Sequence, residues 1–252
     1  MCNTKELTTK QIQYSNKTIT LIYNMSSRFF NPYVGSKYEE GICKKRILVV
    51  GASFYCNKDG EKGRKLCPFF NECTSPVIKD SSKFDTICPE YIGQDLKLSE
   101  EPSNAIEARY RAYQNFASFM RQFIEDKNED VWDRMAFTDY LQFFSPTIDT
   151  KKEYFSKRDF SAFYETLIEL KPNIVVVWGL AVTEEIRDNK ENNGYITDYD
   201  KLPETDYYVC HMQLPKVPHE ISLVCCFHPS SVKYWYGDLE VLTKHMSNVL
   251  KS

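Results

Sequence analysis

Short apolar runs that end abruptly constrain the fold of this chain more than any other feature. Ile174-Val-Val-Val-Trp178 is a continuous, mostly β-branched run, and Ile47–Val50, Met135–Phe137 and Ile221–Phe227 resemble it. Such runs are typical of strands covered on both faces, as in a parallel sheet. Amphipathic helical segments alternate with them. The sequence therefore predicts an α/β fold, a three-layer α/β/α sandwich with a mainly parallel central sheet.

The helical segments are predicted from apolar residues that recur every three or four positions. One helix is expected from Ser103 to about Ile124, with a single apolar stripe that includes Tyr110 and Tyr113. Ser156-Lys-Arg-Asp159 resembles a capping box and predicts a second helix, which Pro172 ends. Further helices are expected at 181–187 and 237–250, and the polar stretch 189–218 is interpreted as a loop with one strand near 207–212.

The length and composition favour one domain in the cytoplasm. A chain of 252 residues is long enough for one substantial α/β domain, and no linker divides it. We expect a single domain over 1–252, with an insertion that contains cysteines at about 56–91. No apolar stretch approaches the roughly 20 residues that span a bilayer. The first residues also lack the basic start and apolar core of a signal peptide, so no membrane association is expected.

Polar residues directly follow three of the apolar runs. Gly51-Ala-Ser-Phe-Tyr55 follows the first, Thr138-Asp139-Tyr140 follows the run at 135–137, and His228-Pro-Ser-Ser231 follows the last. Open α/β folds build their sites where the carboxyl ends of parallel strands meet. Histidine is the side chain that titrates nearest neutral pH. The sequence thus predicts a pocket at this edge that contains His228 and Asp139.

Together with Trp178-Gly179, these motifs resemble the uracil-DNA glycosylase superfamily in order and content. In that superfamily the first strand ends in a loop like G-Q-D-P-Y, a later strand ends near an asparagine, another ends in W-G, and the last ends in H-P-S-P. The likeness covers the core from about Ile47 to Ser231. An uncharacterised bacterial branch, expected to carry G-E-S-H-Y and A-F-Y-N-Y, is more similar still. That likeness extends back to Pro32-Tyr-Val-Gly-Ser-Lys-Tyr38.

The resemblance implies cleavage of the N-glycosidic bond of a nucleotide that is flipped into a closed pocket. It assigns His228 as the neutral imidazole that donates a hydrogen bond to the departing base. Tyr55, aided by Phe54, would form the pocket wall, and Phe69 or Phe70 would stack on the base. Val232 or Tyr234–Tyr236 would fill the space that the base leaves. The remaining expected binding residues are Gly51, Ala52, Ser230 and Ser231.

Two residues depart from the superfamily pattern. Ser53 replaces the water-activating aspartate, and serine has no useful basicity at neutral pH, which puts hydrolysis in question. Asp139 replaces the asparagine that reads the base. An ionised aspartate only accepts hydrogen bonds, so it would suit an amino-bearing edge such as that of cytosine. Alternatively, Asp139 activates water in place of Ser53. The plainer interpretations are a surface aspartate and a buried structural histidine.

The nine cysteines, with no secretory signal, indicate reduced thiols or metal ligands rather than disulfides. Cys56, Cys67, Cys73 and Cys88 are separated by ten, five and fourteen residues. Four thiolates suit a structural zinc ion, or less well an iron-sulfur cluster, but the absence of a C-x-x-C pair leaves free thiols open. The expected chemistry requires no cofactor. Cys225 and Cys226 are expected to pack in a strand.

The net charge of −3 neither requires nor excludes a nucleic-acid partner. A basic face can only be local, at Lys44–Arg46, Lys62–Lys65 or Lys151–Arg158. The preferred hypothesis is a DNA glycosylase-like hydrolase that acts on single- or double-stranded DNA. The alternative is a module that binds a nucleobase or nucleic acid without the chemistry. A third interpretation is a structural protein that reuses the fold, because a fold does not fix function.

Overall fold

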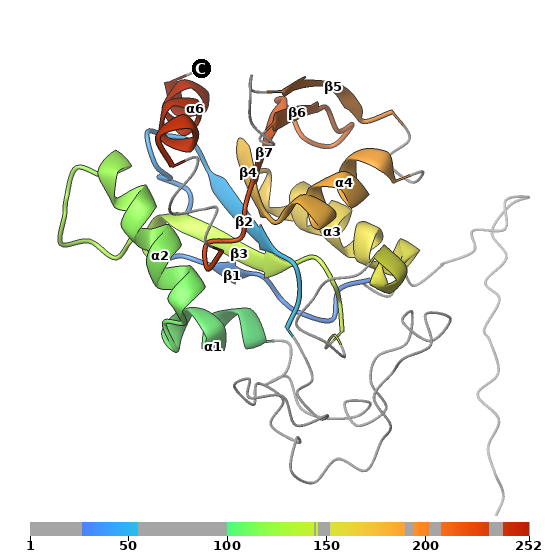
Figure 1. The fold of residues 1–252 in the computed structure, drawn as a ribbon, viewed down its shortest axis with the longest axis horizontal. Coiled ribbons are helices and arrows are strands. Elements are labelled where there is room, and N and C mark those ends of the chain that lie inside the picture. Colours follow the sequence, from blue (N-terminus) through green and yellow to red (C-terminus); the bar gives the residue numbers. More distant parts are fainter. Residues whose placement is uncertain are drawn as a thin grey trace, which may run out of the picture.

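The structure, a computed structural model, describes residues 27–54, 100–143, 145, 152–189, 194–201, 208–231 and 239–251. Its centre is a seven-stranded mixed sheet with the strand order β1-β3-β2-β4-β7-β6-β5 (Figure 1). The strands are β1 (Tyr33–Val34), β2 (Ile47–Gly51), β3 (Met135–Asp139), β4 (Ile174–Trp178), β5 (Ile196–Lys201), β6 (Tyr208–Met212) and β7 (Ile221–Cys226).

The four central strands, β3, β2, β4 and β7, are the predicted apolar runs, and they are mutually parallel. Every residue of β2, β3 and β4 is buried, as expected for strands covered on both faces. The outer strands β1, β6 and β5 pair antiparallel with their neighbours. The α/β prediction is therefore confirmed, but the parallel arrangement is limited to the centre of the sheet.

Helices cover both faces of this sheet, and each face has its own hydrophobic core. Residues of α1, α2 and α6 pack with Ile47 and Val49 of β2 on one face, and residues of α3 and α4 pack with Leu48 and Val50 on the other (Figure 1). Among the described residues, no helix is long and apolar enough to cross a membrane. The helices are α1 (Glu101–Glu107), α2 (Arg111–Met120), α3 (Lys157–Leu170), α4 (Leu180–Asp188) and α6 (Leu239–Lys251), with short 3-10 helices at Arg121–Phe123, Val131–Arg134 and Lys152–Tyr154.

The helix expected from Ser103 to Ile124 is in fact two helices, so that prediction is wrong. Pro102 lies in the first turn of α1, which ends at Glu107. Arg109 then adopts a left-handed backbone with φ 50°, and α2 begins at Arg111. The guanidinium of Arg109 pairs with Asp130 at 2.6 Å. The apolar spacing continues in phase across the break, so periodicity alone could not reveal it.

The stretch 189–218 also differs from the prediction, because it contains two strands rather than one. β6 matches the expected strand, but β5 pairs with it antiparallel and forms the edge of the sheet. The β5 sequence, Ile-Thr-Asp-Tyr-Asp-Lys, is mostly polar, and Tyr199 is exposed. An edge strand of this kind lacks the apolar run from which the central strands were recognised.

The capping box predicted for α3 is present, and it does more than begin the helix. Asp159 Oδ2 accepts hydrogen bonds from the backbone N–H and the hydroxyl of Ser156, both at 2.9 Å. Asp159 Oδ1 accepts a third, at 2.7 Å, from the backbone N–H of Gln142. Gln142 in turn donates from Nε2 to the Asp139 carbonyl at 2.9 Å. One buried carboxyl therefore joins α3 to the segment that follows β3.

We expect Asp159→Ala to lower the free energy of unfolding by about 2 kcal/mol or more, because it removes a cap and leaves the Gln142 N–H unpaired. Urea denaturation measures the loss. Ser161→Ala is the matched control, since Ser161 is exposed on the same helix and bonds only within it. Equal losses in the two variants would contradict the linking role of Asp159.

Candidate functional site

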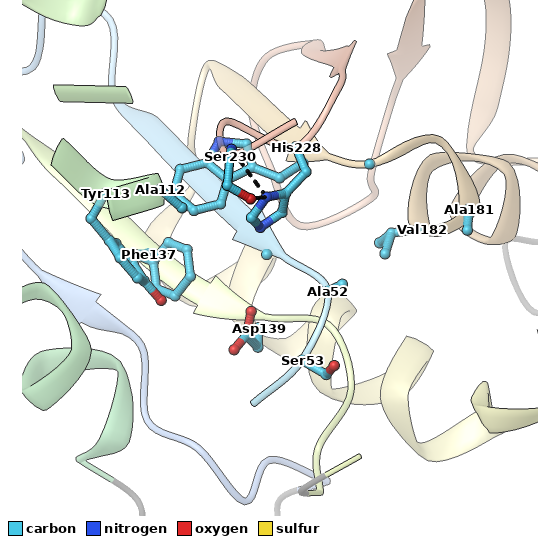
Figure 2. Close-up of a pocket in the computed structure, with 13 residues that line it drawn as sticks. Ala52, Ser53, Ala112, Tyr113, Phe137, Asp139, Ala181, Val182, His228 and Ser230 are labelled. Atoms are coloured by element: carbon cyan, nitrogen blue, oxygen red, sulfur yellow. Dashed lines mark hydrogen bonds between the residues drawn. The ribbon is translucent and has the colours of Figure 1, made fainter. Parts of the chain in front are cut away.

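A cavity of about 530 Å³ lies at the carboxyl ends of the four parallel strands. From β2 the chain moves to β3 on one side and later to β4 on the other, so the segments that follow β2 and β4 diverge. Open α/β folds bind ligands at such a switch point. The lining residues, most of them labelled in Figure 2, are Gly51, Ala52, Ser53, Ala112, Tyr113, Phe137, Asp139, Trp178, Gly179, Ala181, Val182, His228 and Ser230.

The structure brings the three predicted catalytic residues to this one cavity. Ser53 follows β2, Asp139 ends β3, and His228 follows β7 (Figure 2). The predicted binding residues Gly51, Ala52 and Ser230 also line it.

Two predicted binding residues are placed elsewhere. Phe54 is not among the described lining residues, and its ring is buried against Phe30 with 5.1 Å between centroids. Ser231 supports the loop instead, since its backbone N–H donates to the His228 carbonyl at 2.8 Å.

Several predicted residues lie outside the described part of the chain, and their roles stay predictions. They are Tyr55, Phe69, Phe70, Val232, Tyr234–Tyr236 and the four proposed metal ligands Cys56, Cys67, Cys73 and Cys88. Within the described ranges, no group of three or more His, Cys, Asp or Glu side chains is arranged to hold a metal ion. Cys225 and Cys226 are free and buried in β7, where packing was expected.

His228 is held as a neutral hydrogen-bond donor. Its Nδ1 accepts a hydrogen bond from the Ser230 backbone N–H at 3.3 Å and lies 2.7 Å from the Ser230 hydroxyl oxygen. A backbone N–H can only donate, so the proton of the neutral ring is assigned to Nε2. Burial lowers the pKa of His228, which favours the neutral ring at pH 7. The ring meets Trp178 edge to face at 5.7 Å.

Helix α2 fixes the loop that carries His228. The side-chain amide of Asn115 donates a hydrogen bond to the Pro229 carbonyl at 2.9 Å. On the same helix, Ala112 and Tyr113 line the cavity. The helix therefore forms one wall of the site and also anchors the loop that presents the histidine.

Asp139 is buried, with 4% of its surface exposed, and its carboxyl faces His228 across the cavity (Figure 2). It lies opposite Gly51 in the β2–β3 pairing. A Cβ atom at position 51 would overlap Asp139 Oδ1, so the carboxyl occupies space that only glycine leaves free. None of the described residues donates a hydrogen bond to this carboxyl.

The ionisation state of Asp139 differs from the one assumed above. Burial, and secondarily the negative charge of Glu101, raise its pKa to about 8. At pH 7 the side chain is thus mainly a neutral carboxylic acid with one O–H donor and one carbonyl acceptor. A preference for an amino-bearing edge was expected for an ionised Asp139, which only accepts hydrogen bonds. Because burial keeps the proton on Asp139, that preference no longer follows.

Tyr113 and Trp178 are lining residues that the list of predicted site residues omitted. The Tyr113 ring packs at 5.0 Å from Phe137 and 5.5 Å from Trp178. Burial and the charges of Asp139 and Glu101 raise its pKa, so the phenol is neutral. The buried Trp178 indole N–H has no partner among the described residues. The available signals were the tyrosines on an otherwise apolar helical stripe, and the Trp178-Gly179 pair at the end of β4.

Neither the family models nor the curated proteins that were compared with the chain gave a match. The resemblance of the four motifs to the uracil-DNA glycosylase superfamily therefore stays a prediction from the sequence.

We expect Asp139→Asn to stabilise the protein increasingly as the pH rises from about 4 to about 8. The unfolded carboxyl ionises near its ordinary pKa of 3.8, whereas the folded one keeps its proton to about 8, so wild-type stability falls across this window. The uncharged amide avoids that loss, and its advantage at pH 8 should exceed about 1 kcal/mol. Urea denaturation from pH 4 to 9 measures it.

Asp198→Asn is the control, because Asp198 is an exposed acid on β5. It should show no gain that depends on pH. A constant difference between Asp139→Asn and the wild type at every pH would show that Asp139 ionises normally.

Proposed function

We propose that this protein is a DNA glycosylase-like hydrolase that cleaves the N-glycosidic bond of a base flipped into the cavity that Ser53, Asp139 and His228 line. The observation that carries the proposal is that His228, Asp139 and Ser53 converge there from three different strand ends. These residues belong to motifs that are far apart in the sequence, so their meeting at one cavity supports a common role. A cavity of about 530 Å³ is within the range of small-molecule sites.

In this proposal His228 stabilises the leaving group. When the glycosidic bond breaks, the bonding electrons move to the base, which develops negative charge. The Nε2–H group of a neutral imidazole donates a hydrogen bond to that charge, and such donors act most strongly where water is excluded. The hydrogen bonds of Ser230 to Nδ1 support this role, because they favour the tautomer that carries its proton on Nε2.

Asp139 is proposed to contact the edge of the base, with the peptide groups after β2 and the ring of Tyr113 around it. None of the described residues forms a hydrogen bond with the Ser53 hydroxyl that would increase its basicity. The rate then depends chiefly on stabilising the departing base. A water molecule that contacts Ser53 adds its oxygen to the sugar carbon that lost the base, and the proton that this water releases neutralises the base anion, without a strong general base. The activity is accordingly expected to be slow.

The DNA strand would approach the carboxyl edge of the sheet. Lys44–Arg46 precede β2, at the opposite edge, and Arg46 is paired with Glu39 at 3.4 Å. The run that includes Lys152 and Arg158 leads into α3, after the end of β3, and its position makes it the better candidate for phosphate contact, although Lys152 is paired with Glu184 at 3.2 Å.

The second candidate is a binding module that recognises a base without cleaving it. One observation favours it specifically: Ser53 stands where the superfamily carries a water-activating aspartate, and serine has no useful basicity at neutral pH. Product formation separates the two candidates, because both require a base in the cavity.

The test is base release from single- and double-stranded oligonucleotides that contain uracil, hypoxanthine, or unmodified or modified cytosine. Alkali-induced strand breakage reports the abasic product. His228→Ala should lower the release rate by about 100-fold or more, the usual cost of a lost donor of this kind. His211→Ala is the matched control, because His211 lies on β6, bonds to Glu220 and does not line the cavity.

Release by the wild type and by His211→Ala, but not by His228→Ala, would support the glycosylase. Equal rates in all three proteins would exclude the proposed role of His228. No release from any oligonucleotide by folded protein, combined with binding that His228→Ala weakens, would favour the binding module.

A further inference from the structure

His228 lies in a short turn that is closed by its own hydrogen bonds. The backbone N–H of Ser231 donates to the His228 carbonyl at 2.8 Å, and the backbone N–H of Ser230 donates to the ring Nδ1 at 3.3 Å. These bonds fix the imidazole relative to the turn 228–231. They do not determine where the turn lies relative to the cavity, so contacts from outside the turn must do so.

Asn115 of α2 makes such a contact. Its side-chain amide donates to the Pro229 carbonyl at 2.9 Å, between residues 114 positions apart in the sequence. The bond is partly buried, which strengthens it relative to a bond at an open surface. A hydrogen bond weakens steeply when its distance or angle changes, so this one restrains both the separation and the orientation of the turn relative to α2.

The helix that carries Asn115 is a firm support for this bond. Phe116, the next residue, is fully buried, and its ring packs 5.2 Å from that of Trp178 and 6.0 Å from that of Trp132. Ala112, three positions before Asn115 and on the same side of the helix, lines the cavity. Asparagine is an unfavourable residue inside a helix, because its side chain competes for backbone hydrogen bonds. The bond to the turn gives position 115 a reason for an amide that the helix itself does not.

We propose that Asn115 is a positioning residue for His228, and that it holds the turn 228–231 so that the imidazole keeps its place in the cavity wall. A hydrogen-bond donor stabilises developing charge only if its distance and direction are set before the bond breaks, and a misplacement of about 1 Å can cost about a hundredfold in rate. Without the Asn115 amide the turn is held less firmly, and His228 moves with it. That the donor serves a departing base rests on the proposed function, but the hold on the imidazole does not.

The first experiment follows the imidazole without any substrate, by proton NMR of the histidine ring C–H groups as the pH is changed. His228→Ala identifies the His228 resonance by its disappearance. Burial lowers the pKa of His228, and a ring that moves toward water regains the ordinary value, so Asn115→Ala should raise the midpoint. The other titratable side chains that line the cavity, Asp139 from β3 and Tyr113 from α2, keep their protons where a histidine titrates.

Gln114→Ala is the matched control, because it removes a side-chain amide from the neighbouring, exposed position of α2. It should leave the His228 midpoint unchanged. Alanine is the strongest helix former, so α2 should persist in both variants, and urea denaturation checks that they are folded. A midpoint that Asn115→Ala does not move, or that both variants move equally, would overturn the hold of Asn115 on His228.

The second experiment uses base release to separate positioning from general support. Asn115→Ala should lower kcat by about tenfold with little change in KM, because the donor is needed chiefly while the base departs. In a His228→Ala background the same substitution should cause no further loss, since Asn115 acts through His228. Equal losses in the two backgrounds would overturn the positioning role while leaving the hydrolase in place.

If the wild type cleaves no oligonucleotide, the proposed hydrolase fails and the NMR titration alone decides the role of Asn115. A His228 midpoint that rises in Asn115→Ala, but not in Gln114→Ala, would support the hold on the imidazole. The same midpoint in the wild type and in Asn115→Ala would overturn it.

Discussion

The site depends on how the ends of β2 and β3 are joined. Gly51 pairs with Asp139 in register, and the hydrogen bonding continues beyond both strands. The backbone N–H groups of Tyr140, Leu141 and Ser145 donate to the carbonyls of Gly51, Ala52 and Phe54 at 3.0, 3.1 and 2.8 Å. Ser53 lies between Ala52 and Phe54, whose carbonyls accept two of these bonds, and Asp139 directly precedes Tyr140, which donates another. These bonds therefore hold Ser53 and Asp139 in a fixed position relative to each other. Gln142 and Asp159 then connect the same segment to α3.

The described cavity is rich in hydrogen-bonding groups yet nearly uncharged at neutral pH. His228 and Tyr113 are neutral, and Asp139 keeps its proton. The rings of Tyr113, Phe137 and Trp178 form an aromatic part of its wall. Such a surface suits a neutral heterocycle better than a phosphate, which would require a cation or several N–H donors. This agreement between electrostatics and the proposed substrate does not rely on any resemblance.

The parts that the sequence predicted are those governed by local rules. The run Ile174–Trp178 is buried on both faces, and Ser156 with Asp159 forms a cap whose partners lie three residues apart. Parallel strands bring their carboxyl ends to one edge, so the placement of His228 with Asp139 followed from recognising the strands. Glu101 and Tyr113 depend instead on how α1 and α2 pack. The proton on Asp139 depends on burial, which a residue's identity does not reveal.

Trp178 gives the molecule an optical property of its own. The indole lies in the cavity wall, its ring meets that of His228, and its buried N–H has no partner among the described residues. Indole emission responds to polarity, to hydrogen bonding and to a nearby imidazolium. Of the two described tryptophans, Trp132 is buried in the adjoining aromatic core and is not among the described lining residues. Entry of a ligand would therefore change the fluorescence of Trp178 more than that of Trp132, so occupancy of the cavity can be followed without a label.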